Sequence, residues 1–226
     1  GAKSAILGHF YPSMPYSAEQ IIDAGFKFDR ELHVASDISS VDTLFVPYPG
    51  EEELCLSAFM IVKQRFPDVL MIIAPRHPAR GEEIKSLVET NGLKASLRSE
   101  GKEITKDVDV YIANTMGGLG LFYTLSDVAF VGGSLIKWGG HNPMEPARLH
   151  NVVLSGKYVH NFQETYDLLK SEKSVVMVND EKDFASKIKG FFENPDVAKD
   201  YMSRAFYVAE REANVLSRVM EKLKPV

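Results

Sequence analysis

Short apolar runs alternate with amphipathic segments along most of this chain, and this alternation most constrains its fold. Residues 69–74 are continuously apolar, which is typical of a parallel strand buried on both faces. The segment before it, residues 51–66, carries apolar side chains at helical spacing. Strands that alternate with helices predict βαβ units with right-handed crossovers, and therefore an α/β fold with a doubly wound parallel sheet.

The same patterns predict the elements from about residue 42 onward. Strands are expected at 44–46, 69–74, 95–98, 109–113, 128–131, 152–154 and 174–178. Helices are expected at 51–66, 81–90, 119–125, 144–149, 162–170, 181–191, 196–205 and 206–223. Residues 1–40 fit this pattern poorly, apart from a short helix at 18–24, and we interpret them as a connecting segment. Residues 41–226 are expected to form one Rossmann-like domain.

Composition narrows the class of protein and of ligand. The 226 residues are enough for one large α/β domain, and 45% hydrophobic with 25% charged residues is ordinary for a globular protein. A net charge of −5 argues against a broad nucleic-acid surface, so any anion binding has to be local. The single cysteine, Cys55, excludes an internal disulfide and is expected to be a buried small hydrophobe. We expect no metal site, no membrane span and, since no signal peptide is visible, a cytoplasmic protein.

Two glycine pairs follow the expected strand at 128–131. Gly132-Gly133-Ser134 comes first, and Gly139-Gly140 then leads through His141 and Asn142 into a helix start. Glycine lets backbone N–H groups approach a ligand closely, and the positive end of a helix dipole suits an anion. The stretch therefore predicts a site for a phosphate-bearing ligand at the carboxyl end of a parallel strand.

The helix start at the end of this stretch has a structural interpretation as well. Asn142 is expected as the N-cap, with Pro143 in the first helical position and Glu145 completing a capping box. The other interpretation of this helix start is the site for a phosphate-bearing ligand. The two interpretations are compatible, because a capped N-terminus can still present donors.

Two further turns follow expected strands, where ligands bind in open α/β sheets. Arg76 and His77 follow the strand at 69–74, and an arginine can grip a phosphate with two parallel donors. Thr115-Met116-Gly117 follows the strand at 109–113 and offers backbone donors. The alternatives are a surface arginine in a proline-flanked loop and a turn histidine bonded to backbone.

Several short motifs, taken in order and spacing, make the chain from about residue 42 to 224 resemble one family. The motifs are Gly50-Glu51-Glu52-Glu53, Ala74-Pro75-Arg76-His77-Pro78, Asn114-Thr115-Met116-Gly117, Phe130-Val131-Gly132-Gly133-Ser134-Leu135, Gly139-Gly140-His141-Asn142-Pro143-Met144-Glu145-Pro146 and His160-Asn161-Phe162. The chain resembles the C-terminal half of the 3-deoxy-D-manno-octulosonic acid (Kdo) transferases of lipid A biosynthesis. These enzymes have the GT-B fold, in which two Rossmann-like domains face a cleft.

The resemblance implies the donor-binding half of a glycosyltransferase that moves Kdo from CMP-Kdo to the lipid A precursor, at the cytoplasmic face of the bacterial inner membrane. It implies that an N-terminal half binds the acceptor, carries the general base and makes any membrane contact, so this chain alone is expected to be inactive. No cofactor is expected, because helix dipoles and arginine can replace a cation at the leaving phosphate. The donor-binding residues are expected to be Arg76, His77, Thr115, Met116, Gly117, Gly132, Gly133, Ser134, Gly140, His141, Asn142 and Glu145.

The chain also departs from the family at two turns. Before Gly50 the family usually has Ser-Thr-His, whereas this chain has Pro47-Tyr48-Pro49, which removes two backbone donors. Around Thr115-Met116-Gly117 the family usually has two carboxylates, and this chain has Asn114 and Gly118 in their places.

These departures leave alternative functions open. One is another nucleotide-sugar glycosyltransferase or a sugar-nucleotide epimerase, and the other is a non-catalytic module that binds a nucleotide. The acidic run Glu51-Glu52-Glu53 is interpreted mostly as a favourable interaction with the dipole of the following helix, and none of the three is assigned a catalytic role.

Overall fold

A computed structural model describes residues 43–102 and 104–222 of the chain. The expected connecting segment at 1–40, with its short helix at 18–24, lies outside the described residues.

The described residues form one seven-stranded sheet in which all paired strands are parallel, in the order β3-β4-β2-β1-β5-β6-β7. The strands are β1 (Thr43–Val46), β2 (Met71–Ile73), β3 (Ala95–Leu97), β4 (Val110–Ile112), β5 (Val128–Val131), β6 (Val152–Ser155) and β7 (Val175–Met177). From β1 in the middle, the chain first moves to β2 and later returns to the other side of β1 as β5. This reversal is the topological switch point of a doubly wound sheet, so the predicted fold class is confirmed.

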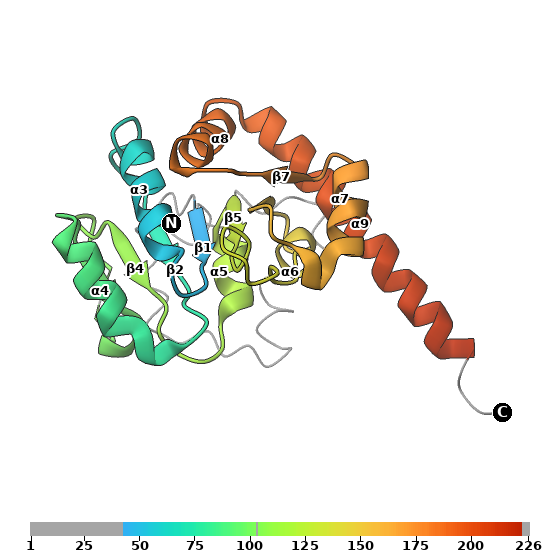
Figure 1. The fold of residues 1–226 in the computed structure, drawn as a ribbon, viewed down its shortest axis with the longest axis horizontal. Helices are drawn as coiled ribbons and strands as arrows, with labels where there is room; N and C mark the ends of the chain where they lie inside the picture. Colours follow the sequence, from blue (N-terminus) through green and yellow to red (C-terminus); the bar gives the residue numbers. More distant parts are fainter. Residues whose placement is uncertain (1–42, 103, 223–226) are drawn as a thin grey trace, which may run out of the picture.

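Helices cover both faces of the sheet (Figure 1). They are α3 (Glu52–Lys63), α4 (Gly81–Thr90), α5 (Leu119–Leu125), α6 (Met144–Arg148), α7 (Gln163–Ser171), α8 (Glu181–Glu193) and α9 (Pro195–Lys222), with 3-10 turns η2 (Pro78–Arg80), η3 (Arg98–Glu100) and η4 (His160–Phe162). α3, α4, α8 and the first part of α9 share one hydrophobic core with the sheet, and α5, α6, α7 and the later part of α9 pack on its other face.

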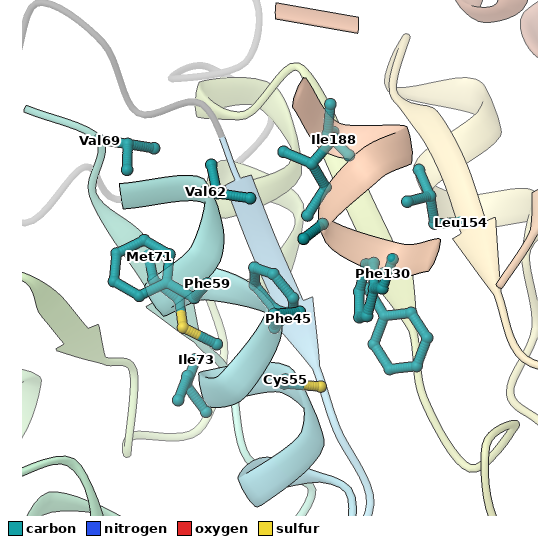
Figure 2. Packing of buried hydrophobic residues seen from close by; sticks show 14 of the residues in the cluster. Phe45, Cys55, Phe59, Val62, Val69, Met71, Ile73, Phe130, Leu154 and Ile188 are labelled. Carbon is teal, nitrogen blue, oxygen red and sulfur yellow. The ribbon is translucent and has the colours of Figure 1, made fainter. Parts of the chain in front are cut away.

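The first of these cores is built on aromatic side chains of the central strands. The Phe130 ring lies 4.8 Å from the Phe184 ring, and the Phe45 ring lies 5.4 Å from it, between ring centroids. Phe59 and Val62 of α3 point toward the sheet from the same side (Figure 2). Because side chains alternate along a strand, Phe130 faces this core while its neighbours in β5 face the other. The expected burial of Cys55 is confirmed, since it has no exposed surface.

Two helix predictions were wrong in extent. Residues 195–222 form one helix, α9, instead of two helices that meet at Ala205 and Phe206. Ala205, Val208 and Ala209 are all buried in the same core, so one apolar stripe runs through the expected break. α3 begins at Glu52 and ends at Lys63, three residues before the expected end at residue 66.

Candidate functional site

The turns that follow β1, β2, β4 and β5 all leave the carboxyl edge of the sheet, because the strands are parallel. The strand order reverses between β1 and β5, and in open α/β sheets ligands bind at the carboxyl edge beside such a reversal. Every residue predicted to bind the donor lies on one of the turns after β2, β4 and β5, or in the first turn of α6.

The first glycine turn is occupied by a carboxylate of the chain itself. One Glu51 oxygen, Oε1, accepts hydrogen bonds from the N–H groups of Ser134 at 2.9 Å and Leu135 at 2.7 Å. The other, Oε2, accepts from Gly133 at 2.6 Å and Tyr48 at 2.8 Å. Glu51 is only 1% exposed. The expectation that Gly133 and Ser134 offer free backbone donors to a phosphate was therefore wrong, and so was the interpretation of Glu51 as a dipole effect.

The second glycine pair also uses its backbone inside the protein. The Gly140 N–H donates to the Gly133 carbonyl at 2.7 Å, and the His141 N–H donates to the Gly132 carbonyl at 3.2 Å. Gly140 is buried with φ +78°, and a Cβ there would lie 3.2 Å from the Tyr158 carbonyl oxygen. The positive φ and the close packing within the protein are therefore enough to account for glycine at this position.

Ser134 serves the same internal structure through its side chain. Its hydroxyl donates to the Val131 carbonyl at 2.7 Å and accepts from the Gly156 N–H at 2.8 Å. Its carbonyl accepts from the Tyr158 N–H at 2.8 Å. Ser134 has no exposed surface, so a direct contact between its side chain and a ligand is excluded in this arrangement.

The start of α6 differs by one residue from the expected capping box. The helix begins at Met144 with Pro143 as its N-cap residue, and the Asn142 side-chain oxygen accepts from the Met144 N–H at 3.0 Å. Among the described residues no hydrogen bond from Glu145 closes a capping box, so that prediction was wrong. Both Asn142 and Glu145 are exposed and remain available to a ligand. Partial burial of the Glu145 carboxyl, which removes water from around it, raises its pKa above the usual value.

Two aromatic rings meet where the turns after β1 and β5 come together. Tyr48 stacks on Trp138, with ring centroids 4.2 Å apart and planes at 21°. The Tyr48 ring also lies 6.0 Å from the ring of His141. Trp138 is 50% exposed, so this pair forms part of the surface at the switch point. Tyr48 is the central residue of the Pro47-Tyr48-Pro49 departure, which therefore puts an aromatic ring at the position of the threonine in the Ser-Thr-His motif.

Arg76 and His77 follow β2 and are both exposed. The half-buried His141 has a lowered pKa, first because of burial and second because of the positive charge of Arg76, with Glu51 acting in the opposite direction. Arg76 therefore lies within electrostatic reach of His141, although the two residues come from different turns. Nε2 of His141 is buried and has no hydrogen-bond partner among the described residues.

The turn after β4 explains both of its departures from the family. The Asn114 amide donates to the Ser99 hydroxyl at 2.8 Å and accepts from the Ser99 N–H at 3.0 Å, so it ties this turn to η3, which follows β3. Gly118 has φ +81°, a conformation that glycine adopts far more easily than glutamate. Met116 is 87% exposed and Gly117 is exposed, so both can meet a ligand.

Comparison with known proteins agrees with this geometry. The 3-deoxy-D-manno-octulosonic acid transferase of Haemophilus influenzae is 29% identical over 238 residues, which cover 99% of this chain and 56% of that protein. The C-terminal CMP-Kdo binding domain of WaaA from Acinetobacter baumannii matches with a TM-score of 0.73 and 28% identity, over 79% of this chain and 95% of that domain. The chain is a relative of the Kdo transferases.

The resemblance inferred from the motifs is thus confirmed, although no family model matches the chain. The UDP-GlcNAc 2-epimerase of Neisseria meningitidis has a TM-score of 0.54 at 13% identity, over 88% of this chain and 50% of that one, which shows a shared fold only. The fold is that of the C-terminal domain of a GT-B glycosyltransferase. The chain spans a little over half the length of the Haemophilus Kdo transferase.

Sequence reasoning missed Glu51 and Trp138 in this relative of the Kdo transferases. The only signal for Trp138 was a lone tryptophan beside a glycine pair, and the signal for Glu51 was masked by the two acidic residues after it. In the part of the chain that the structure describes, no group of three or more His, Cys, Asp or Glu side chains could hold a metal ion. No helix within that part is long and apolar enough to cross a membrane.

Acid should destabilise the fold through His141. Because the pKa of His141 is lowered in the folded protein, this side chain takes up a proton near pH 6.5 in the unfolded chain but stays neutral in the folded protein until a lower pH. Stability is therefore complete above about pH 6.5 and falls as the pH drops below it. Urea unfolding at pH 7.5 and 5.5 should show a larger loss for the wild type than for His141→Gln. Equal losses would show that His141 does not titrate differently in the two states.

Proposed function

We propose that this chain is the donor-binding half of a Kdo transferase, which transfers Kdo from CMP-Kdo to the lipid A precursor. The observation that carries the proposal is the joint sequence and structural similarity to a domain described as binding CMP-Kdo. The similarity to the Haemophilus Kdo transferase, of which the chain covers 56%, supports a two-part enzyme. The acceptor and the general base then belong to the other part, which works at the cytoplasmic face of the inner membrane.

In this proposal the donor lies along the carboxyl edge of the sheet. The exposed guanidinium of Arg76 binds the phosphate, because the nearby glycine turn already holds the Glu51 carboxylate. Thr115, Met116 and Gly117 contact the nucleoside, and Asn142 and Glu145 contact hydroxyl groups at the start of α6. Trp138 offers its half-exposed ring to the donor at the switch point.

The transfer step needs charge stabilisation at the leaving group. A hydroxyl of the acceptor gives its proton to the general base of the other part and attacks the anomeric carbon of Kdo, and the bond between that carbon and the phosphate oxygen breaks. CMP leaves with the electron pair, so negative charge grows on its phosphate. Arg76 lowers the barrier by placing a fixed positive charge beside that oxygen, as pre-organised donors do in other transfer reactions. Because the pKa of His141 is lowered, its ring is neutral near pH 7 and adds no positive charge beside Arg76.

The test is a titration of the 226-residue chain with CMP, followed by calorimetry and by the fluorescence of Trp138, its single tryptophan. The wild type should bind CMP more tightly than UMP or AMP. Arg76→Ala should lose about 1.5–3 kcal/mol, or roughly 10- to 150-fold in affinity, because one charge-assisted contact is removed.

Arg65→Ala is the matched control for this titration. Arg65 is also an exposed arginine, but it pairs with Glu193 beyond the end of α3. The Arg65→Ala variant should bind CMP with the same affinity as the wild type. Absence of CMP binding by the wild type would refute the proposed function, and equal affinity of Arg76→Ala would remove Arg76 from the site.

A further inference from the structure

We propose that the Glu51 carboxylate positions the two turns that form the donor site, the turn after β1 and the turn after β5. It acts through other residues and does not itself touch the donor. The inference extends the proposed function, on which its binding measurement rests, while its stability measurement is independent of any ligand.

Three successive N–H groups, those of Gly133, Ser134 and Leu135, converge on one point after β5. Such a concave set of backbone donors binds anions, and the sequence of this turn predicts a phosphate site. Glu51 fills it from inside the protein, with distances of 2.6–2.9 Å to the three nitrogens. With the Tyr48 N–H at 2.8 Å, each carboxylate oxygen accepts two hydrogen bonds, which satisfies an ionised carboxylate. The three backbone N–H groups are therefore already bonded, and none of them is free to bind a phosphate.

The four hydrogen bonds connect the two sides of the topological switch point. Tyr48 and Glu51 belong to the turn between β1 and α3, and residues 133–135 belong to the turn after β5. Tyr48 stacks on Trp138, so the position of that stack depends on the Glu51 carboxylate. A carboxylate in this place fixes how far the turn after β1 stands from the turn after β5.

The same carboxylate acts on His141 through the glycine loop. Glu51 holds Gly133, whose carbonyl accepts from Gly140, and the adjacent Gly132 carbonyl accepts from His141. Loss of the carboxylate would leave four N–H donors, two of them buried, without their acceptor, and the loop would move. The ring of His141 and the exposed ring of Trp138 would then shift relative to Arg76.

Comparison with Glu52 and Glu53 distinguishes the positioning role of Glu51 from a general effect of acidic residues at this helix start. Glu52 is also buried, at 3% exposed, but it pairs with Arg80 and accepts from the Gly50 N–H at 2.8 Å. Glu53 is exposed. The three residues carry the same side chain near the same helix start, so Glu53 serves as a control for charge and for the helix dipole.

The first test compares Glu51→Gln with Glu53→Gln. Glutamine keeps the shape of the side chain, but its amide N–H₂ group faces backbone N–H donors. We expect the melting temperature to fall by roughly 6–12 °C for Glu51→Gln and to change little for Glu53→Gln. At 15 °C, where both variants are folded, CMP affinity should fall about tenfold for Glu51→Gln only.

The second test is chemical rescue of Glu51→Ala by sodium formate, with sodium chloride at the same concentration as the control. Formate should occupy the vacated donors, raise the melting temperature of Glu51→Ala by several degrees and restore CMP affinity, with no such effect on the wild type or on Glu53→Ala. A role of Glu51 in stability alone would not predict recovered affinity.

Two results would overturn the proposal. One is a Glu51→Gln variant that matches Glu53→Gln in both melting temperature and CMP affinity, which also decides the case if Glu51→Ala does not fold. The other is a formate effect that is equal in every variant. A wild type that does not bind CMP would instead refute the proposed function, and the rescue of stability would still test Glu51.

Discussion

Replacement of Gly156 by alanine should lower the melting temperature of this domain by roughly 6–12 °C, or prevent folding. Gly156 follows β6, and a Cβ there would lie 2.2 Å from the Ser134 carbonyl oxygen and 2.6 Å from the Leu135 nitrogen. Both are backbone atoms, so no flexible side chain can move aside. Overpacking of this kind costs about 3 kcal/mol or more, and each kcal/mol shifts the melting temperature of a domain this size by roughly 2–4 °C.

The surrounding hydrogen bonds explain why neither backbone can yield. Ser134 and Leu135 donate to the Glu51 carboxylate, and the Ser134 carbonyl accepts from Tyr158. The Gly156 N–H itself donates to the Ser134 hydroxyl. Any shift that makes room for a methyl group breaks at least one of these buried bonds, which adds to the steric cost.

Gly190→Ala is the matched control for this substitution. Gly190 lies inside α8, and a Cβ there would meet no atom within 4 Å. Alanine should stabilise the protein by about 0.5–1 kcal/mol, because glycine in a helix interior is unfavourable. The same chemical change is thus expected to have opposite signs at the two positions. If Gly156→Ala melts at the same temperature as the wild type, Gly156 does not lie as close to Ser134 and Leu135 as the structure has it.

The 226-residue chain should bind CMP-Kdo and yet give no transfer product with the lipid A precursor. On the proposed function, the general base and the acceptor site belong to the remaining part of a longer enzyme, since the chain covers 56% of the Haemophilus relative. General base catalysis contributes roughly 10²–10⁴-fold, and orientation of the acceptor contributes further. We therefore expect the rate to lie at least about 10⁴-fold below that of a complete Kdo transferase.

The measurement is product formation from CMP-Kdo and a lipid A precursor, followed by mass spectrometry. A full-length Kdo transferase serves as the positive control, and CMP binding by the same sample of the 226-residue chain shows that its donor site is folded. Clear turnover by this chain would place the base within these residues and would overturn the division into donor and acceptor halves.

Much of the fold could be predicted from the sequence, because its signals are local. A buried parallel strand reads as a continuous apolar run, and β2 lies within the expected run at 69–74. The strand β5 has the expected bounds, Val128–Val131. The positions of Arg76 and of Thr115 to Gly117 after strands follow from the same patterns. α9 was missed as a single helix because no local signal distinguishes one long apolar stripe from two short ones.

The use of the glycine turn was decided by tertiary structure. From sequence, glycines and free N–H groups after a strand indicate a phosphate site, and they do form a set of converging donors. Their partner is Glu51, which lies 82 to 84 residues away in the chain. Nothing local distinguishes Glu51 from the exposed Glu53. Only the pairing of β1 with β5 brings this carboxylate to those donors, and burial then makes it their permanent partner.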